Sequence, residues 1–221
     1  MLNPTSHSPA PAAGVSPELG SPTTGPIALG SATAGRGAGA SWPPAAEELP
    51  GPLRERLARI RLLCLDVDGV LSDGHLYFLG EDEAGPRWGM RFAVRDGVGI
   101  KRLQAAGIEV AILSEGALPG SQARARSLGV RHAFFGLKDK LSRFTALCQE
   151  LGVAAEQAAF VGDELSDLPL LRAVGFAATV PEAVSDLHRA VHYITQRPGG
   201  AGAVREVCEM ILGQRSARAG S

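Results

Sequence analysis

Acidic side chains stand in two closely spaced groups in this chain of 221 residues, and each group directly follows a short apolar run. Asp66 and Asp68 form the first group, and Asp163 and Asp167 form the second. Carboxylates that crowd together repel one another unless a hard cation such as Mg²⁺ lies between them. The two groups therefore indicate a magnesium site, provided that the fold brings them together.

A hydroxyl and an ammonium group occupy comparable positions. Ser114 follows the apolar run 108–113, and Lys140 stands near the start of a helical pattern. Together with a cation, these two groups can bind the oxygens of a phosphoryl group. Each residue alone has an ordinary explanation, because Asp favours turns and helix starts and most lysines are solvated. The placement of polar residues after several apolar runs is what predicts a phosphate pocket.

The elements that must position these residues are read from the hydrophobic pattern. Apolar runs typical of buried strands alternate with helical patterns from residue 53 onward, and a closing helix is expected over 203–212. The strands are expected over 60–65, 108–113, 158–161, 176–180 and 191–195. Such alternation predicts an α/β fold, a Rossmann-like doubly wound parallel sheet with helices on both faces. Functional residues in this fold lie at the carboxyl ends of the strands.

Three segments lie outside this alternation. Residues 1–52 hold ten of the fifteen prolines without helical or strand periodicity, which predicts a disordered tail. Residues 75–94 carry aromatic residues at both ends of a polar centre, which predicts a β-hairpin flap. The folded domain is expected over 53–215, with a flexible C-terminus over 216–221.

Composition excludes several classes of protein. The chain has 22 Lys and Arg against 23 Asp and Glu, a balance that argues against a nucleic-acid partner. Its three cysteines are far apart in the sequence, which argues against a disulfide scaffold or a cysteine zinc site. No apolar run reaches the length of a membrane span, so no membrane association is expected and the cytoplasm is the expected location.

Taken together, the motifs resemble those of the haloacid dehalogenase superfamily of aspartyl-phosphate phosphatases. The matching pieces are D-V-D-G-V from Asp66, then Ser114, then Lys140, then G-D-E-L-S-D from Gly162 to Asp167. More narrowly, the segments 65–74, 94–100 and 199–208 resemble the branch that hydrolyses 3-deoxy-D-manno-octulosonate 8-phosphate, a step of lipopolysaccharide biosynthesis. Members of this branch lack a large cap domain and form homotetramers in which the hairpin meets neighbouring subunits.

The resemblance implies a two-step phosphoryl transfer. Asp66 would be the nucleophile and form an aspartyl-phosphate, while Asp68 would act as general acid and then as general base. Mg²⁺ would bind the carboxylates of Asp66 and Asp163 and the backbone carbonyl of Asp68. Asp167 would support this site through a water or from behind the ligands.

The resemblance also implies how the substrate is held. Ser114 and Lys140 would bind the phosphoryl group, with Asp167 beside them, and Arg95 would face the carboxylate of a phosphorylated keto-sugar acid. The Gly199–Gly202 loop has two open interpretations, an anion site or a flexible turn.

Two departures from the branch leave the substrate open. The octulosonate enzymes usually read T-G-R where this chain reads S-E-G at 114–116, and they tend to have arginine where this chain has Ala201. A phosphatase of nine-carbon keto-sugar acid 9-phosphates is therefore an alternative. A second is a catalytically silent oligomerisation domain like the C-terminal part of CMP-sialic acid synthetases, although such domains would be expected to lose the nucleophile.

Two further classes fit less well. A phospho-accepting receiver domain would need an Asp after its third strand, and the region 133–136 has none. A dehalogenase is disfavoured because Asp68 is present to transfer a proton to an alkoxide.

Overall fold

A parallel β-sheet forms the centre of the molecule in the computed structural model, which describes residues 42–219. Its six strands lie in the order β5-β4-β1-β6-β7-β8, and every neighbouring pair is parallel. The strands are β1 (Leu62–Leu65), β4 (Glu109–Leu113), β5 (His132–Phe134), β6 (Ala158–Val161), β7 (Phe176–Thr179) and β8 (Tyr193–Ile194). The predicted doubly wound α/β fold is confirmed.

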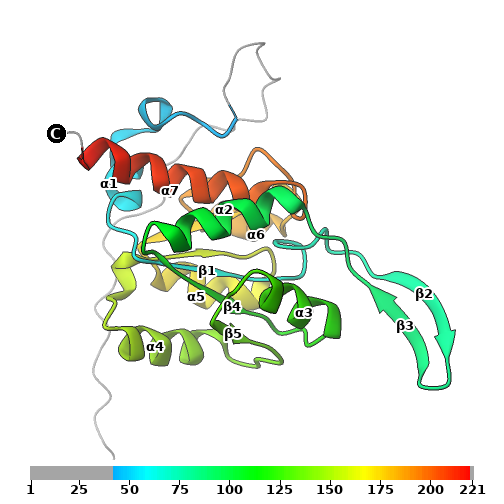
Figure 1. Cartoon of the computed structure of the whole chain (residues 1–221). Helices are drawn as coiled ribbons and strands as arrows, with labels where there is room; N and C mark the ends of the chain where they lie inside the picture. Colours follow the sequence, from blue (N-terminus) through cyan, green and yellow to red (C-terminus); the bar gives the residue numbers. More distant parts are fainter. Residues whose placement is uncertain (1–41, 220–221) are drawn as a thin grey trace, which may run out of the picture.

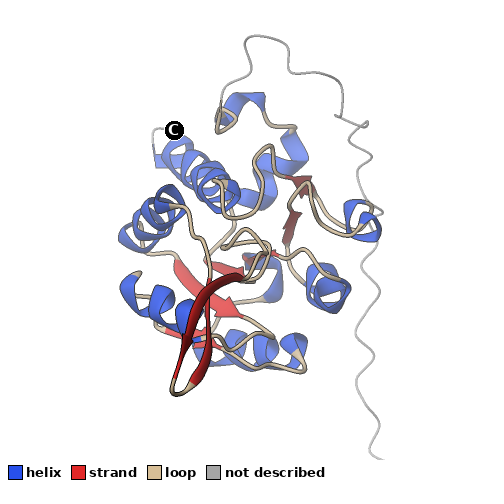
Figure 2. Ribbon diagram, turned by 90° about the vertical axis from the view of Figure 1, so that its right-hand side faces the viewer, coloured by secondary structure: helices blue, strands red, loops and turns tan. Residues whose placement is uncertain are grey.

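Helices cover both faces of the sheet (Figures 1 and 2). One face packs against α1 (Gly51–Leu57), α2 (Val94–Ala105) and α7 (Ala203–Ala219). The opposite face packs against α4 (Lys140–Leu151) and α5 (Leu168–Ala173). The remaining helices are α3 (Pro119–Ser127), which follows β4, and α6 (Ser185–His188), which precedes β8.

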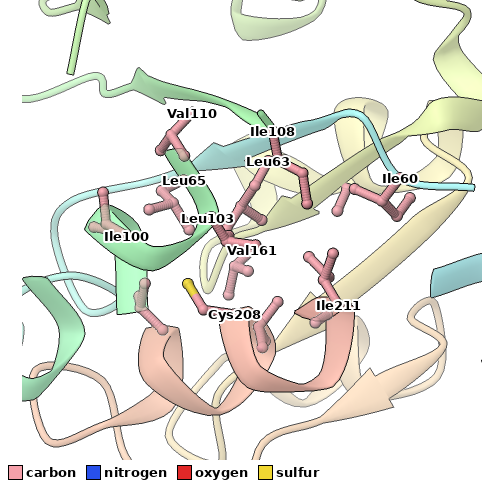
Figure 3. Packing of buried hydrophobic residues seen from close by; sticks show 14 of the residues in the cluster. Ile60, Leu63, Leu65, Ile100, Leu103, Ile108, Val110, Val161, Cys208 and Ile211 are labelled. Atoms are coloured by element: carbon pink, nitrogen blue, oxygen red, sulfur yellow. The ribbon is translucent and has the colours of Figure 1, made fainter. Parts of the chain in front are cut away.

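The central strand β1 shows how the sequence specifies two cores. Leu63 and Leu65 point into the cluster that holds α2 and α7, as Figure 3 shows, whereas Leu62 and Cys64 point into the cluster that holds α4 and α5. All four side chains are fully buried. Successive side chains of a strand point to opposite faces, so a continuous apolar run is what a strand covered on both sides requires.

Helix α4 is defined at both ends by its sequence. The side chain of Asp139 caps the start by accepting a hydrogen bond from the backbone N–H of Ser142 at 2.9 Å. Gly152 ends the helix in the left-handed conformation, with φ of 61°. These signals make Lys140 the first residue of the helix and place it beside the carboxyl end of the sheet.

An antiparallel hairpin projects from the domain between β1 and α2 (Figure 1). It consists of β2 (Tyr77–Asp82) and β3 (Gly85–Gly89), and both strands lie within the predicted range 75–94. Phe78 and Trp88 face each other across the pair, with ring centroids 5.5 Å apart. The hairpin exposes most of its apolar side chains.

The boundary of the predicted N-terminal tail is wrong at its C-terminal end. Residues 1–41 lie outside the described part, but residues 42–50 pack against the domain: Leu49 is buried in the main core, and Trp42 donates a hydrogen bond to Glu206. The proline content concealed a regular feature, because Leu49, Leu53 and Leu57 are spaced four residues apart and all three are buried on the α1 side.

The C-terminal boundary differs as well. Helix α7 extends to Ala219, past the predicted domain end at residue 215, and residues 220–221 lie outside the described part. All three cysteines are buried and free. Among residues 42–219, no helix combines the length and the hydrophobicity needed to cross a bilayer.

Candidate active site

The loops that follow β1, β4 and β6 converge at the carboxyl edge of the sheet. Asp66, Ser114 and Asp163 come from these loops, and Lys140 reaches them from the first turn of α4. A cavity of about 240 Å³ opens at this edge, lined by Asp66, Asp68, Glu115, Gly116, Lys140, Glu164 and Ser166. All of the lining residues except Gly116 have charged or polar side chains, so the cavity suits a charged, hydrophilic ligand.

A buried ammonium group links the two acidic motifs. The Nζ atom of Lys140 lies 3.0 Å from Asp66 Oδ1 and 2.6 Å from Asp167 Oδ1. Burial alone would lower the pKa of Lys140, but the two carboxylates outweigh burial and raise it. Lys140 therefore remains protonated and supplies fixed positive charge to the floor of the cavity.

Three carboxylates lie close together beside Lys140. One oxygen from each of Asp66, Asp163 and Asp167 lies within 4.8 Å of the others. Burial raises the pKa of Asp66 to about 7, although Lys140 opposes this, and burial with the neighbouring carboxylates raises the pKa of Asp163 to about 8. A divalent cation beside these groups would offset the cost of holding two buried negative charges together.

The hydrogen bonds show which of the three carboxylates are available to a cation. Asp167 is fully engaged, because Oδ1 accepts from Lys140 and Oδ2 accepts from the backbone N–H groups of Asp163 and Glu164 at 3.0 and 3.3 Å. Asp163 Oδ1 is buried and has no hydrogen-bond partner among the described residues. Asp66 Oδ1 likewise has no hydrogen-bond partner among these residues, although Lys140 lies beside it. Asp66 and Asp163 therefore fit a cation directly, whereas Asp167 holds Lys140 and the backbone of residues 163 and 164 in place.

Asp68 lies nearer the mouth of the cavity than Asp66. A Cβ atom built on Gly116 would be 2.4 Å from Asp68 Oδ2, so the missing side chain of Gly116 makes room for this carboxylate. Burial raises the pKa of Asp68, and Lys140 partly opposes this. Asp68 thus holds a proton more readily than an ordinary aspartate, as a general acid must.

Ser114 lies beneath the cavity and is fully buried. Its hydroxyl donates a hydrogen bond to the carbonyl of Gly116 at 3.2 Å, and its backbone N–H donates to the carbonyl of Phe134 on β5. Ser114 is not among the residues that line the cavity, although its neighbours Glu115 and Gly116 are.

Arg95 is not brought into this group of residues. It lies on the first turn of α2, outside the cavity lining, and its guanidinium carbon is 5.7 Å from the centroid of the Trp42 ring. The lining instead contains Ser166, which was not among the predicted site residues. Its position in the G-D-E-L-S-D motif directly after β6 was the available signal, because segments that follow the strands of such a sheet lie at its carboxyl edge.

The Gly199–Gly202 loop packs behind the first acidic motif. The backbone N–H of Gly200 donates to the carbonyl of Val70 at 3.0 Å, and Gly199 and Gly200 are buried. The structure therefore favours neither of the two interpretations, a flexible turn or an open anion site. The loop instead packs against the segment that follows β1.

Comparison with known proteins assigns the family. The sequence pattern of the haloacid dehalogenase-like hydrolases matches residues 78–175. The chain is also 42% identical over 158 residues to the 3-deoxy-D-manno-octulosonate 8-phosphate phosphatase KdsC of Yersinia pestis, an alignment that covers 72% of this chain and 82% of that protein. This chain belongs to the haloacid dehalogenase-like hydrolases.

Solved structures of other proteins share the fold. The 3-deoxy-D-manno-octulosonate 8-phosphate phosphatase of Moraxella catarrhalis, in complex with a magnesium ion, a phosphate ion and a KDO molecule, superposes with a TM-score of 0.69 at 35% identity and covers 76% of this chain and 96% of its own. The hypothetical protein XCC2798 of Xanthomonas campestris gives a TM-score of 0.72 at 42% identity, with coverage of 77% and 91%.

Proposed function

We propose that this chain is a Mg²⁺-dependent phosphatase that acts in the cytoplasm on a phosphorylated keto-sugar acid, with 3-deoxy-D-manno-octulosonate 8-phosphate as substrate. The observation that carries the proposal is the joint placement of Asp66, Asp68 and Lys140 around one polar cavity. The 42% identity to the Yersinia pestis enzyme supports the choice of substrate.

In the proposed first step, a carboxylate oxygen of Asp66 attacks phosphorus while the bond from phosphorus to the sugar oxygen breaks. Asp68 gives its proton to the departing alkoxide, so the sugar leaves as a neutral alcohol and the phosphoryl group stays on Asp66. Lys140 and Ser114 hold the phosphoryl oxygens during the transfer.

In the second step, Asp68 takes a proton from water, and the water oxygen attacks the phosphorus of the aspartyl-phosphate. The bond between phosphorus and Asp66 breaks, which releases inorganic phosphate and restores the free carboxylate. Asp66, Asp163 and the backbone carbonyl of Asp68 would hold Mg²⁺, which supplies positive charge for the phosphoryl oxygens when it is bound. Asp167 keeps Lys140 in place through its 2.6 Å ion pair.

One feature of the cavity separates this chain from the octulosonate enzymes. Glu115 lines the cavity and lies 3.9 Å from Lys138, at the position after Ser114 where the octulosonate enzymes usually have glycine. A carboxylate there accepts hydrogen bonds from sugar hydroxyls and repels a nearby carboxylate, so it bears on which sugar acid fits. Arg95, whose side chain is exposed, is proposed to offset this repulsion by pairing with the carboxylate of the substrate.

The experiment is a measurement of phosphate release by the purified chain with Mg²⁺. We expect the highest kcat/KM with 3-deoxy-D-manno-octulosonate 8-phosphate, a lower value with a nine-carbon keto-sugar acid 9-phosphate and the lowest with a neutral hexose 6-phosphate. A higher kcat/KM with the nine-carbon substrate would show that the chain is a phosphatase of nine-carbon keto-sugar acid 9-phosphates instead. A preference for the neutral sugar phosphate would contradict the sugar-acid proposal and leave a phosphatase of another specificity.

A further inference from the structure

Glu206 is a buried carboxylate that the proposed reaction does not use. It lies on the first turn of α7, is completely inaccessible to solvent, and accepts hydrogen bonds on both oxygens. Oε1 accepts from the hydroxyl of Tyr193 and the backbone N–H of Gln196, both at 2.7 Å. Oε2 accepts from the indole N–H of Trp42 at 2.7 Å and from the backbone N–H of Arg197 at 3.2 Å.

These four donors come from three separate parts of the chain. Trp42 belongs to the N-terminal segment, Tyr193 to β8, and Gln196 and Arg197 to the loop that leads to Gly199. A buried carboxylate that accepts from four donors restrains all of their positions, because moving one donor away weakens the hydrogen bonding of a carboxylate that water does not reach. Glu206 thus anchors the loop 196–202 at its beginning.

The far end of this loop presses against the backbone of the catalytic motif. A Cβ atom on Gly199 would lie 1.7 Å from the carbonyl oxygen of Gly69, so the two backbones are in direct contact. Gly69 is enclosed on its other side as well, since a Cβ atom there would be 2.0 Å from Asp163 Oδ2. The turn that carries Asp68 is therefore held between the loop 196–202 and Asp163, with no free space on either side.

We propose that Glu206 is a positioning residue: by fixing the loop 196–202, it sets the backbone of residues 68–73 and thereby the place of the Asp68 carboxylate at the scissile oxygen. This inference rests on the proposed function for the role of Asp68. The loop 196–202 contacts the turn that carries Asp68, so the position of the loop determines the alignment of this carboxyl group with the substrate. Misalignment of about 1 Å at a reacting group can cost about 100-fold in rate.

The test compares two substrates that differ in their need for a general acid. A sugar phosphate releases an alkoxide and needs the proton of Asp68, whereas p-nitrophenyl phosphate releases a stable phenolate and does not. In Glu206→Gln, an amide NH₂ group replaces one of the two carboxylate oxygens. Because this group is itself a donor, it cannot accept the two hydrogen bonds that the oxygen received. We expect kcat for the sugar phosphate to fall about tenfold or more, and kcat for p-nitrophenyl phosphate to fall less than about threefold.

Three further variants make the result specific. Tyr193→Phe removes one donor and keeps the ring, so it should give the same split between substrates with a smaller loss, even if Glu206→Gln folds poorly. Asp68→Asn calibrates the split that loss of the acid produces. Glu209→Gln is the matched control, because Glu209 lies on the same helix but pairs at the surface with Arg102 and Arg205; it should leave both rates unchanged.

Amide hydrogen exchange provides a readout that does not depend on turnover. We expect Glu206→Gln to accelerate exchange in residues 66–74 and 196–202 and to leave β4 unchanged. An equal loss with both substrates, no loss with either, or unchanged exchange in residues 66–74 would overturn the positioning role. Absence of turnover in the wild-type chain would instead refute the proposed function, and the exchange result would still decide whether Glu206 holds the catalytic turn.

Discussion

Gly116 determines how closely the chain approaches the proposed general acid. Any side chain there would place its Cβ atom 2.4 Å from Asp68 Oδ2, so Asp68 would have to move. We predict that Gly116→Ala lowers kcat for the sugar phosphate about tenfold or more with little change in KM, because the acid is displaced while the phosphoryl site at Lys140 is kept.

The matched control for this substitution is Gly120→Ala. Gly120 lies in α3, and a Cβ atom there would meet no atom within 4 Å. Steady-state kinetics of both variants check the prediction. Unchanged kcat in Gly116→Ala would mean that Asp68 is not confined by this glycine.

Residue types and their spacing predict most of the candidate site. Asp66, Ser114 and Asp163 each follow a strand of a parallel sheet, and such positions meet at one edge of the sheet. The sequence could not show that both oxygens of Asp167 are engaged, nor that Glu206 joins Trp42 to the loop before Gly199, since these contacts depend on side-chain directions and on residues far apart in the chain. The catalytic roles themselves stay predictions.

At the scale of elements, His192 connects β7 to the segment that leads into β8. Its Nδ1 atom accepts a hydrogen bond from the backbone N–H of Ala177 at 2.9 Å, and its ring stacks on Phe176. Burial, with a smaller contribution from Arg56, lowers the pKa of His192 from 6.5 to about 4. The folded state therefore holds this ring neutral.

This shift predicts a dependence of stability on pH. Between about pH 6.5 and 4 the unfolded chain binds a proton at His192 and the folded chain does not, so the free energy of unfolding falls as the pH falls, by up to ~3 kcal/mol from this group. In His192→Asn, which keeps an acceptor but does not titrate, urea unfolding should show a flatter dependence over this range. An equally steep fall in the variant would contradict the prediction.

The N-terminal segment is the second element with a measurable contribution. Removal of residues 42–50 deletes the buried side chain of Leu49 and the hydrogen bond from Trp42 to Glu206. We predict that a chain beginning at Gly51 melts about 5 °C or more below a chain beginning at Trp42, because a buried leucine alone contributes about 2–5 kcal/mol. Equal melting temperatures would show that this segment adds nothing to the stability of the domain.

Helices and strands with a strong hydrophobic pattern were predicted well. Short helices, and helices whose pattern is interrupted by prolines, were not. The run 158–161 coincides with β6, and the helix that Gly152 ends was evident from its apolar spacing. Helix α1 was missed because prolines surround it, although Pro52 is compatible with a first helical turn. Helix α6 has four residues, too few to show a period.

At the scale of the whole molecule, the hairpin exposes an apolar surface that a single chain leaves uncovered. Its exposed large side chains are Leu76, Tyr77, Phe78, Leu79 and Trp88, with exposed fractions between 41% and 60%. Large apolar side chains exposed together on one element are typical of an interface. We propose that it packs against other copies of the chain in a homotetramer.

Light scattering coupled to size-exclusion chromatography checks the assembly. We predict a tetramer for the wild-type chain and smaller species for the double variant Phe78→Ser and Trp88→Ser, with the far-UV spectrum retained because the hairpin lies outside both cores. A monomeric wild-type chain would refute the proposed assembly.

The central claim is that Asp66 is the nucleophile of a Mg²⁺-dependent phosphatase, and single-turnover phosphate release from 3-deoxy-D-manno-octulosonate 8-phosphate tests it most directly. We predict that Asp66→Asn loses phosphate release by about 1,000-fold or more while its thermal unfolding stays cooperative. A chelator should stop the wild-type reaction until Mg²⁺ is restored. The control Asp186→Asn changes an exposed aspartate outside the cavity lining and should react as the wild type does. Phosphate release by Asp66→Asn at a rate near that of the wild type would contradict the account.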